Sequence, residues 1–234
     1  MGFLDNLIEW DQQMLLLLNS YHLPWLDRLM WLFSETQMWL PFMLTMIVVL
    51  FKNKNGQAFL LILTFAILIL FTDQISSGLI KPLVARFRPS HDPEIGNLVQ
   101  IVNNYKGGNY GFISSHAANV FAFAGLSLLL FRNWLYTVAI LLWATAVSYS
   151  RIYLGVHFPL DVICGAAFGF LSSIAFFYLY KFLIQYSSSI RFYTDRRSEQ
   201  VTSTNFKKND LYFIVLVLLM IIVMMLLAAI NLTW

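Results

Sequence analysis

The chain has 234 residues, of which 59% are hydrophobic and only 12% are charged, and its formal net charge is +3. Soluble domains carry about 25% charged residues, so this composition excludes an ordinary soluble protein and predicts one that crosses a membrane several times. The single cysteine, Cys164, excludes an internal disulfide and a cysteine-rich metal site. We expect one domain over residues 1–234, without a metal, a cofactor or a nucleic-acid partner.

The first twenty residues combine apolar periodicity with acidic side chains. Met1–Asn6 has no positively charged segment, and Asp5, Glu9 and Asp11 precede the first apolar run, so we do not expect a signal peptide. The alternation of acidic residues with leucines predicts an amphipathic helix that lies in the membrane interface, or one that packs on the bundle. A break at 22–24 ends this helix, and 25–33 is predicted to form a second interfacial helix.

Six apolar segments follow, each near the ~20 residues that a helix needs to cross a bilayer. We place them at 36–51, 57–80, 115–131, 134–154, 158–181 and 211–230. The expected fold class is therefore all-α, a polytopic membrane bundle of about six transmembrane helices with an N-terminal interfacial helix. The segment 211–230 lies beyond the region that carries the motifs described below.

Lysine and arginine counts in the loops predict the orientation, because cytoplasmic loops carry an excess of both. One side of the membrane receives nine of these residues: Lys52, Lys54, Arg132, Lys181, Arg191, Arg196, Arg197, Lys207 and Lys208. The other side receives six: Arg28, Lys81, Arg86, Arg88, Lys106 and Arg151. The first side is predicted to face the cytoplasm and the second the periplasm, in the inner membrane of a bacterium.

Three clusters of charged and polar residues fall on the predicted outer side, and charges at membrane depth are a default sign of function. In the first cluster, Lys81 and Arg88 are seven residues apart, which on a helix places both on one face. Pro82 suits the first turn of a helix, and Pro89 ends one. Two such cations can clamp a phosphate, but taken alone the pattern favours basic residues that anchor a helix end to lipid head groups.

The second cluster is Ser114-Ser115-His116, which leads directly into the apolar segment 115–131. Either serine can cap the N-terminus of that helix, where free N–H groups and the helix dipole attract an anion. His116 is then expected in the first turn, where it can donate a proton to a leaving oxygen. Taken alone, the pattern favours an ordinary helix cap with an interfacial histidine.

The third cluster runs from Ser150 to Asp161 and lies between two apolar segments. Pro159 marks the start of a helix, so His157 precedes that helix and Asp161 lies four residues further on. A carboxylate at that distance can fix the histidine tautomer and leave the other ring nitrogen free to attack. The alternative is a structural salt bridge between Arg151 and Asp161, which leaves His157 unexplained.

Together the clusters resemble the three motifs of the type 2 phosphatidic acid phosphatase (PAP2) family: Lys-x6-Arg-Pro, Pro-Ser-Gly-His and Ser-Arg-x5-His-x3-Asp. Residues 81–89 match the first motif and residues 150–161 the third, within a motif-bearing region of about 57–180. The second motif stands here as Ile113-Ser114-Ser115-His116, so its proline and glycine are replaced. Ser115 still supplies a backbone N–H, but serine does not easily take the positive φ that glycine allows.

The resemblance implies a lipid phosphatase that works without a metal. In it, His157 attacks phosphorus to form a phosphohistidine, Asp161 orients His157, and His116 protonates the leaving oxygen and then activates water. The resemblance further implies a set of residues that hold the phosphate oxygens: Lys81, Arg88, Ser114, Ser115 and Arg151.

The implied substrate is a lipid phosphate or pyrophosphate, because the site lies at the membrane surface. Undecaprenyl pyrophosphate, a lipid A phosphate and phosphatidylglycerol phosphate all stay open. The first is slightly favoured, because Arg86 and Lys106 can supply the extra positive charge that a pyrophosphate needs. A transporter or flippase, an inactive relative and a phosphatase of soluble substrates are the alternatives, and the sequence does not indicate an oligomeric state.

Three further features lie near the motifs. The outer loop 86–113 contains a glycine-rich stretch, 107–111, which predicts either a mobile lid or a passive connector. Residues 92–94 predict a turn, or else an acidic filter at the rim of the site. Asp73 lies inside the second apolar segment, where a hydrogen bond to a neighbouring helix is the favoured role.

Overall fold

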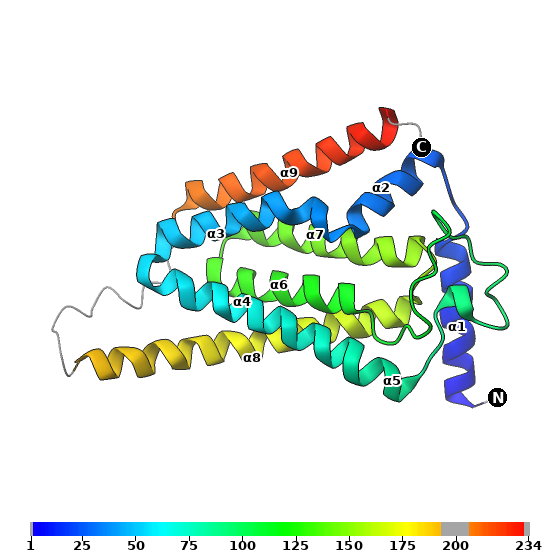
Figure 1. The fold of residues 1–234 in the computed structure, drawn as a ribbon, viewed down its shortest axis with the longest axis horizontal. Coiled ribbons are helices and arrows are strands. Elements are labelled where there is room, and N and C mark those ends of the chain that lie inside the picture. Colours follow the sequence, from blue (N-terminus) through cyan, green and yellow to red (C-terminus); the bar gives the residue numbers. More distant parts are fainter. Residues whose placement is uncertain (1, 193–205, 232–234) are drawn as a thin grey trace.

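This computed structural model describes residues 2–192 and 206–231, and its long helices lie side by side in a bundle (Figure 1). The expected fold class, a helical membrane bundle, is confirmed. Among the described residues the one β pairing is an isolated bridge between Phe87 and Tyr110. In chain order the elements are α1 (Phe3–Leu18), α2 (Pro24–Ser34), η1 (Thr36–Trp39), α3 (Leu40–Lys54), η2 (Asn55–Gln57), α4 (Ala58–Asp73), η3 (Gln74–Ile80), α5 (Lys81–Val84), η4 (Pro89–His91), α6 (Ser115–Phe131), α7 (Trp134–Tyr153), α8 (Pro159–Phe192) and α9 (Lys208–Asn231).

All six predicted spans overlap helices, but they do not all have the length of a span. Within the described residues, four stretches are long and apolar enough: Ala58–Val84, Trp134–Tyr153, Pro159–Tyr186 and Lys208–Asn231. A fifth arises when α2 is counted together with η1 and α3, although the two parts meet at an angle of 70°. Helix α6 is apolar but has only 17 residues, about 26 Å at 1.5 Å per residue, which is shorter than a typical bilayer core.

Helix α6 runs through the middle of the bundle, where it contacts α4, α7 and α8. Its close approach to α8 depends on small residues, as is common between membrane helices. A Cβ on Gly165 would lie 2.5 Å from the carbonyl oxygen of Ser114, and a Cβ on Gly169 would lie 2.0 Å from that of Ala118. These glycines therefore set the N-terminus of α8 against the N-terminus of α6.

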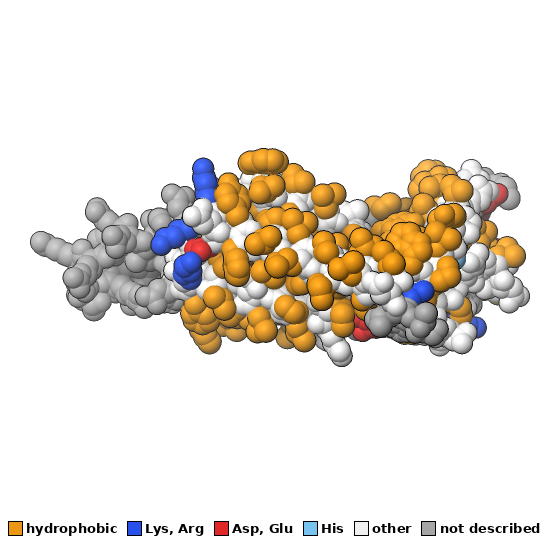
Figure 2. Space-filling view, turned by 90° about the horizontal axis from the view of Figure 1, so that it is seen from above, with side chains coloured by type: hydrophobic (Ala, Val, Ile, Leu, Met, Phe, Trp, Pro, Cys, Tyr) orange, Lys and Arg blue, Asp and Glu red, His pale blue; other side chains and the backbone are white. Residues whose placement is uncertain are grey.

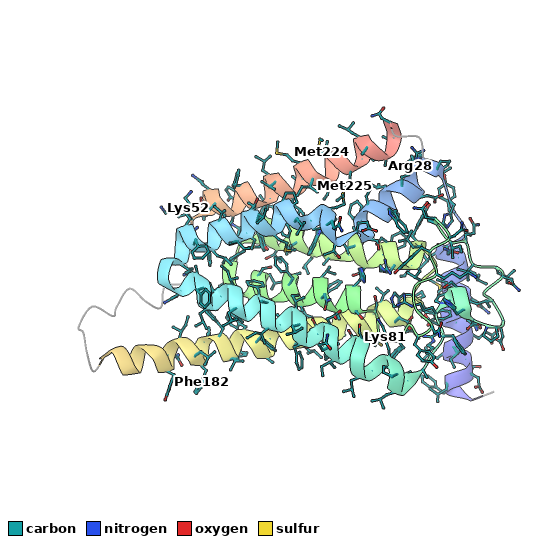
Figure 3. All side chains as sticks on the ribbon, viewed as in Figure 1. Arg28, Lys52, Lys81, Phe182, Met224 and Met225 are labelled. Carbon is teal, nitrogen blue, oxygen red and sulfur yellow. The ribbon has the colours of Figure 1, made fainter. Side chains whose placement is uncertain are left out.

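Apolar side chains cover the flank of the bundle, and Figure 2 shows them between charged residues at either end. Helix α9 illustrates the division between lipid-facing and core positions, because Met224 is 67% exposed whereas its neighbour Met225 is only 4% exposed (Figure 3). A protein in water would not leave such a surface uncovered. The exposed apolar flank accordingly fits the multi-pass membrane protein that the composition predicts.

Helix α1 is present as predicted and crosses one end of the bundle (Figure 1), where it packs against α7 and α8. Its outer face carries exposed apolar residues such as Phe3, Leu4 and Leu17, whereas Asp11 and Leu15 are fully buried. The second of the two expectations for this helix, packing on the bundle, is therefore met. The predicted second interfacial helix corresponds to α2, which packs against α7 and α9 and continues across the bend towards α3.

Lysines and arginines that the sequence assigned to opposite sides of the membrane lie at opposite ends of the bundle. Figure 3 shows Lys52 at the end where α3 turns into α4, and Arg28 and Lys81 towards the opposite end, which we call the site end. Of the nine residues assigned to the first side, 196 and 197 lie outside the described residues. Which end faces the cytoplasm stays a prediction.

Candidate active site

The three sequence clusters meet at the site end, and hydrogen bonds join them in pairs. Arg88 Nη1 lies 3.2 Å from His157 Nε2 and links the first cluster to the third. Lys81 Nζ donates to Ser115 Oγ at 2.7 Å and links the first to the second. The backbone N–H of Ser114 donates to the carbonyl of Asp161 at 2.9 Å and links the second to the third. One site therefore includes all three clusters.

His157 lies in the turn between α7 and α8 and is only 1% exposed. Its Nδ1 is 3.4 Å from Asp161 Oδ2, and that oxygen also accepts the N–H of Phe158 at 3.0 Å. A proton on Nδ1 satisfies the carboxylate and leaves the lone pair on Nε2 to accept from Arg88. Burial, followed by the charge of Arg88, holds the pKa of His157 well below its usual 6.5. A neutral imidazole whose Nε2 carries a lone pair and no proton is the form that can act as a nucleophile.

The first cluster is not a helix face, so the prediction that Lys81 and Arg88 lie on one helix is wrong. Pro82 does lie in the first turn of α5, but Ala85 takes a left-handed conformation with φ of 49° and ends that helix. Pro89 does not end a helix either, because it begins η4. Lys81 thus reaches the site from the end of a span, whereas Arg88 reaches it from the loop that follows.

The loop 86–113 encloses the Arg88 side chain, which is 8% exposed. Its guanidinium donates to the carbonyls of Tyr110 at 3.2 Å and Val156 at 3.1 Å. A Cβ on Gly107, which has a φ of +69°, would lie 2.9 Å from Arg88 Nη1, and a Cβ on Gly111 would lie 2.9 Å from Asp161 Oδ2. The glycine-rich stretch therefore permits close approach to two site residues, and its motion as a lid stays a prediction.

The second cluster forms the N-terminus of α6. Ser114 is the cap, and its Oγ accepts the N–H of Ala117 at 3.4 Å. Ser115 is the first residue of the helix and does not take a positive φ. Its hydroxyl lies 2.7 Å from both Lys81 Nζ and Ser77 Oγ. The serine that replaces the expected glycine therefore keeps its backbone N–H at the helix start and holds Lys81 in place.

Arg151 is 3% exposed, and one of its terminal nitrogens donates to Ser34 Oγ. Its Nε has no hydrogen-bond partner among the described residues. The alternative of a salt bridge from Arg151 to Asp161 is wrong, because the arginine that pairs with Asp161 is Arg86, at 3.1 Å. A buried cation with an unused donor is costly unless an anion binds there.

Arg86 is not the free cation that the sequence suggested. Its guanidinium lies between two buried carboxylates, 2.7 Å from Asp11 and 3.1 Å from Asp161, and 4.0 Å from the centre of the Phe158 ring. Asp11 also accepts the N–H of Leu160 at 2.9 Å. Two negative charges neutralise Arg86, so it is not available as the extra cation for a pyrophosphate. Lys106, the other proposed cation, is exposed in the loop.

Asp11 is the site-end residue that sequence reasoning missed, although a signal was present. It falls on the face of α1 that also carries Leu7, Leu15 and Leu18, and a charge within an apolar stripe needs a partner. The pattern shows that a partner must exist but not which residue it is, since Arg86 lies 75 positions away.

The remaining predictions near the site have clear outcomes. Asn119 of α6 donates to Asp73 at 3.3 Å, which confirms a bond from Asp73 to a neighbouring helix. Asp92 Oδ1 accepts the N–H groups of Glu94 and Ile95 at 3.0 and 3.2 Å, so residues 92–94 form the predicted turn.

A cavity of about 460 Å³ borders this site. His116 and Arg151 are among the residues that line it. The other lining residues come from the break between α2 and α3, residues 34–37, together with Trp31 and Tyr105. This size lies within the range of roughly 300–1,000 Å³ that is usual for small-molecule sites.

Comparison with known proteins agrees with this geometry. Residues 57–185 match the PAP2 superfamily. The chain is 38% identical over 179 residues to a lipid A 4'-phosphatase of Bacteroides thetaiotaomicron, which covers 75% of this chain and 79% of that protein. It is 30% identical over 165 residues to an undecaprenyl-diphosphatase of Sulfolobus acidocaldarius, which covers 69% of this chain and 74% of that protein.

Two crystal structures have a similar fold. LpxE of Aquifex aeolicus matches with a TM-score of 0.53 and 25% identity, over 70% of this chain and 92% of that one. The first transmembrane PAP2-type phosphatidylglycerolphosphate phosphatase from Bacillus subtilis matches with a TM-score of 0.53 and 22% identity, over 82% of this chain and 89% of that one. The second supports the fold alone. The resemblance seen in the three motifs is confirmed: the chain belongs to the PAP2 superfamily and is a membrane lipid phosphatase, a hydrolase of phosphate esters.

Proposed function

We propose that this phosphatase hydrolyses a phosphate monoester on the head group of a lipid, and that the reaction passes through a phosphorylated His157. The observation that carries the proposal is the setting of His157. Asp161 occupies Nδ1, and the lone pair of Nε2 is directed to the side of Arg88. A phosphate bound by Arg88 is thereby placed next to the atom that attacks it.

The reaction has two steps. His157 Nε2 attacks phosphorus and forms an N–P bond, while the P–O bond to the head group breaks and the leaving oxygen takes a proton from His116. His116 then takes a proton from water, whose oxygen attacks phosphorus and breaks the N–P bond. Inorganic phosphate leaves, and both histidines return to their starting states.

Three cations and a helix N-terminus stabilise the charge that develops on phosphorus. Lys81, Arg88 and Arg151 have no carboxylate within ion-pair distance among the described residues, so their charge is available to the phosphate oxygens. The Ser114 hydroxyl and the first N–H groups of α6, including that of Ser115, add hydrogen bonds and the favourable end of the helix dipole. Donors fixed before the reaction need little reorganisation as the transition state forms.

The substrate we favour is a lipid A phosphate rather than undecaprenyl pyrophosphate. Two relatives at 38% identity are lipid A 4'-phosphatases, from Bacteroides thetaiotaomicron and Porphyromonas gingivalis. The preference for a pyrophosphate rested on Arg86 and Lys106 as free cations, and Asp11 and Asp161 pair with the first of these. The relative at 30% identity keeps undecaprenyl diphosphate as the second candidate.

The site is proposed to face the periplasm, from the inner membrane of a bacterium. The support is the distribution of lysine and arginine, since the end opposite the site carries the larger share. Phosphate release also separates this function from a transporter or flippase, which would move the lipid without cleaving it.

The test is phosphate release by the purified protein in detergent with EDTA present. The substrates are lipid A, undecaprenyl diphosphate and phosphatidylglycerol phosphate, each given to the wild type and to His157→Ala. We expect release that survives EDTA, is fastest with lipid A and is lost in the variant. Rapid quenching with labelled substrate should trap an acid-labile, base-stable phosphate on the wild type. Release that persists in His157→Ala would contradict the histidine mechanism.

A further inference from the structure

The cavity beside the site lies where the leaving group of the proposed hydrolysis would be. The inference drawn from this position rests on the function proposed above. In an in-line displacement the leaving group departs on the side opposite the attacking His157. His116 protonates the leaving oxygen, so that oxygen must lie next to the His116 ring. Both His116 and Arg151 line the 460 Å³ cavity. The part of the lipid attached to the leaving oxygen therefore extends into this cavity, which we call the leaving-group pocket.

The other walls of the leaving-group pocket are polar and aromatic rather than basic. Glu35, Thr36 and Gln37 are brought there by the 70° break between α2 and α3. Trp31 and Tyr105 contribute aromatic rings that meet edge to face, with their centres 5.6 Å apart. Carboxylate, hydroxyl and amide groups hydrogen-bond to hydroxyls, and aromatic rings pack against the apolar faces of a sugar ring.

Glu35 is the one acidic residue among the described residues that line this pocket. Its carboxylate has no salt bridge among the described residues, and it lies near enough to Arg151 to interact with that charge. A phosphate monoester on a sugar releases a neutral hydroxyl. A lipid diphosphate instead releases a lipid monophosphate, whose negative charge would lie in the same pocket as Glu35.

We propose that the leaving-group pocket binds the hydroxylated sugar that carries the phosphate, and that Glu35 disfavours anionic leaving groups. Glu35 is then a specificity-determining residue that selects sugar phosphate monoesters over lipid diphosphates. The cations of the phosphate site bind the transferred phosphate of either substrate. The two substrates are distinguished in the leaving-group pocket, on the other side of the bond that breaks.

The test compares the wild type with Glu35→Gln, which removes the charge but keeps the size of the side chain. For each protein, kcat/KM is measured on lipid A, on undecaprenyl diphosphate and on methyl phosphate, whose leaving group carries neither a sugar nor a ring. Like charges separated by several ångströms at a protein surface interact strongly enough that we expect the ratio of diphosphate to lipid A hydrolysis to rise about five- to tenfold. Glu94→Gln is the matched control, because Glu94 is exposed at the same end and outside the pocket, and its ratio should not change.

A second variant tests the sugar itself. Trp31→Ala removes one aromatic ring from the pocket, and we expect kcat/KM for lipid A to fall about tenfold while that for methyl phosphate stays within about twofold.

The outcomes separate the two proposals. If Glu35→Gln changes all three substrates by one factor, Glu35 acts only through Arg151 and the pocket proposal is overturned. An equal loss on lipid A and methyl phosphate in Trp31→Ala would overturn it as well. If the wild type releases phosphate from none of the three substrates, the proposed function fails rather than the pocket.

Discussion

The two ends of the bundle both gather charged residues, but they use them in opposite ways. At the end where α3 turns into α4, Lys52 pairs with Asp210 at 2.6 Å, and its side chain is 58% exposed. Asn53 donates to the same carboxylate at 2.9 Å, so the negative charge is satisfied by residues of the chain. At the site end, Arg88 and Arg151 are at most 8% exposed and have no carboxylate partner among the described residues.

The difference shows what keeps the phosphate site available. The site end does contain buried carboxylates, Asp11 and Asp161, but both bind Arg86. Because Arg86 pairs with both carboxylates, neither of them pairs with Arg88 or Arg151. Leaving those two cations unpaired costs folding free energy, and in the proposed function a bound phosphate recovers it.

The largest expected effect separates the proposed nucleophile from the other residues of the site. His157→Ala should lower kcat by at least about 10⁴-fold, because it removes the nitrogen that we propose attacks phosphorus. Lipid phosphate hydrolysis measures the loss, and circular dichroism with thermal unfolding shows whether the fold is kept. An activity within tenfold of the wild type would mean that another residue attacks.

The next prediction breaks the site end directly. Removing one phosphate-binding cation by Arg88→Ala should lower kcat/KM about 10²- to 10³-fold, since the cation stabilises charge that develops in the transition state. In thermal unfolding, orthovanadate or inorganic phosphate should raise the Tm of the wild type and not that of the variant. An equal rise in Tm for both proteins would show that the anion binds elsewhere.

A smaller effect is expected where the two carboxylates share Arg86. Asp11→Asn keeps the shape of the side chain but removes one of the two charges that hold Arg86, so the pairing of Asp161 with His157 should be disturbed. We expect kcat to fall about 10-fold, with little change in KM, as is usual when a supporting partner is removed. Asp5→Asn on the same helix serves as the control, because Asp5 is exposed and bonds to the N–H of Gly2. A change in KM alone would show that Asp11 does not help to position His157.

The pH dependence follows from the setting of His157. Burial and the Arg88 charge lower the pKa of His157 below 6.5, so its imidazole stays neutral and nucleophilic as the pH falls through that value. In the pH profile of kcat/KM, the loss of activity caused by protonation of His157 should therefore occur below pH 6.5. The unfolded chain does bind a proton near pH 6.5, so the contribution of this residue to stability is fully present above that pH and declines below it. In Arg88→Met the acid limb should move to higher pH, and a limb that does not move would contradict this account.

The smallest effect belongs to the opposite end of the bundle. Lys52→Ala removes a partly exposed ion pair, and such pairs contribute about 1 kcal/mol or less to the free energy of unfolding. Activity should stay within about twofold of the wild type, and Lys208→Ala should behave in the same way. A large loss of activity in Lys52→Ala would show that the two ends are coupled through the bundle.

The sequence determined the class of the protein and most of the site. Long apolar segments must satisfy their backbone groups internally in a bilayer, so each one predicted a helix. His157 and Asp161 could be paired from sequence because their contact spans only four residues at a helix start. The motifs could be placed at one end because alternate segments cross in opposite directions.

Only the tertiary structure decided how distant residues are paired. Lys81 and Arg88 meet around the end of α5 and not along a helix face, because Ala85 breaks the helix in a loop that has no periodic pattern. Asp11 and Arg86 are 75 positions apart, and Ser115 and Lys81 are 34 apart. Such pairs depend on how α1, α6 and α8 pack together, and packing is a property of surfaces in contact rather than of local spacing. Composition and periodicity thus fixed which residues had to be buried, and the packing of the bundle chose which partner each of them has.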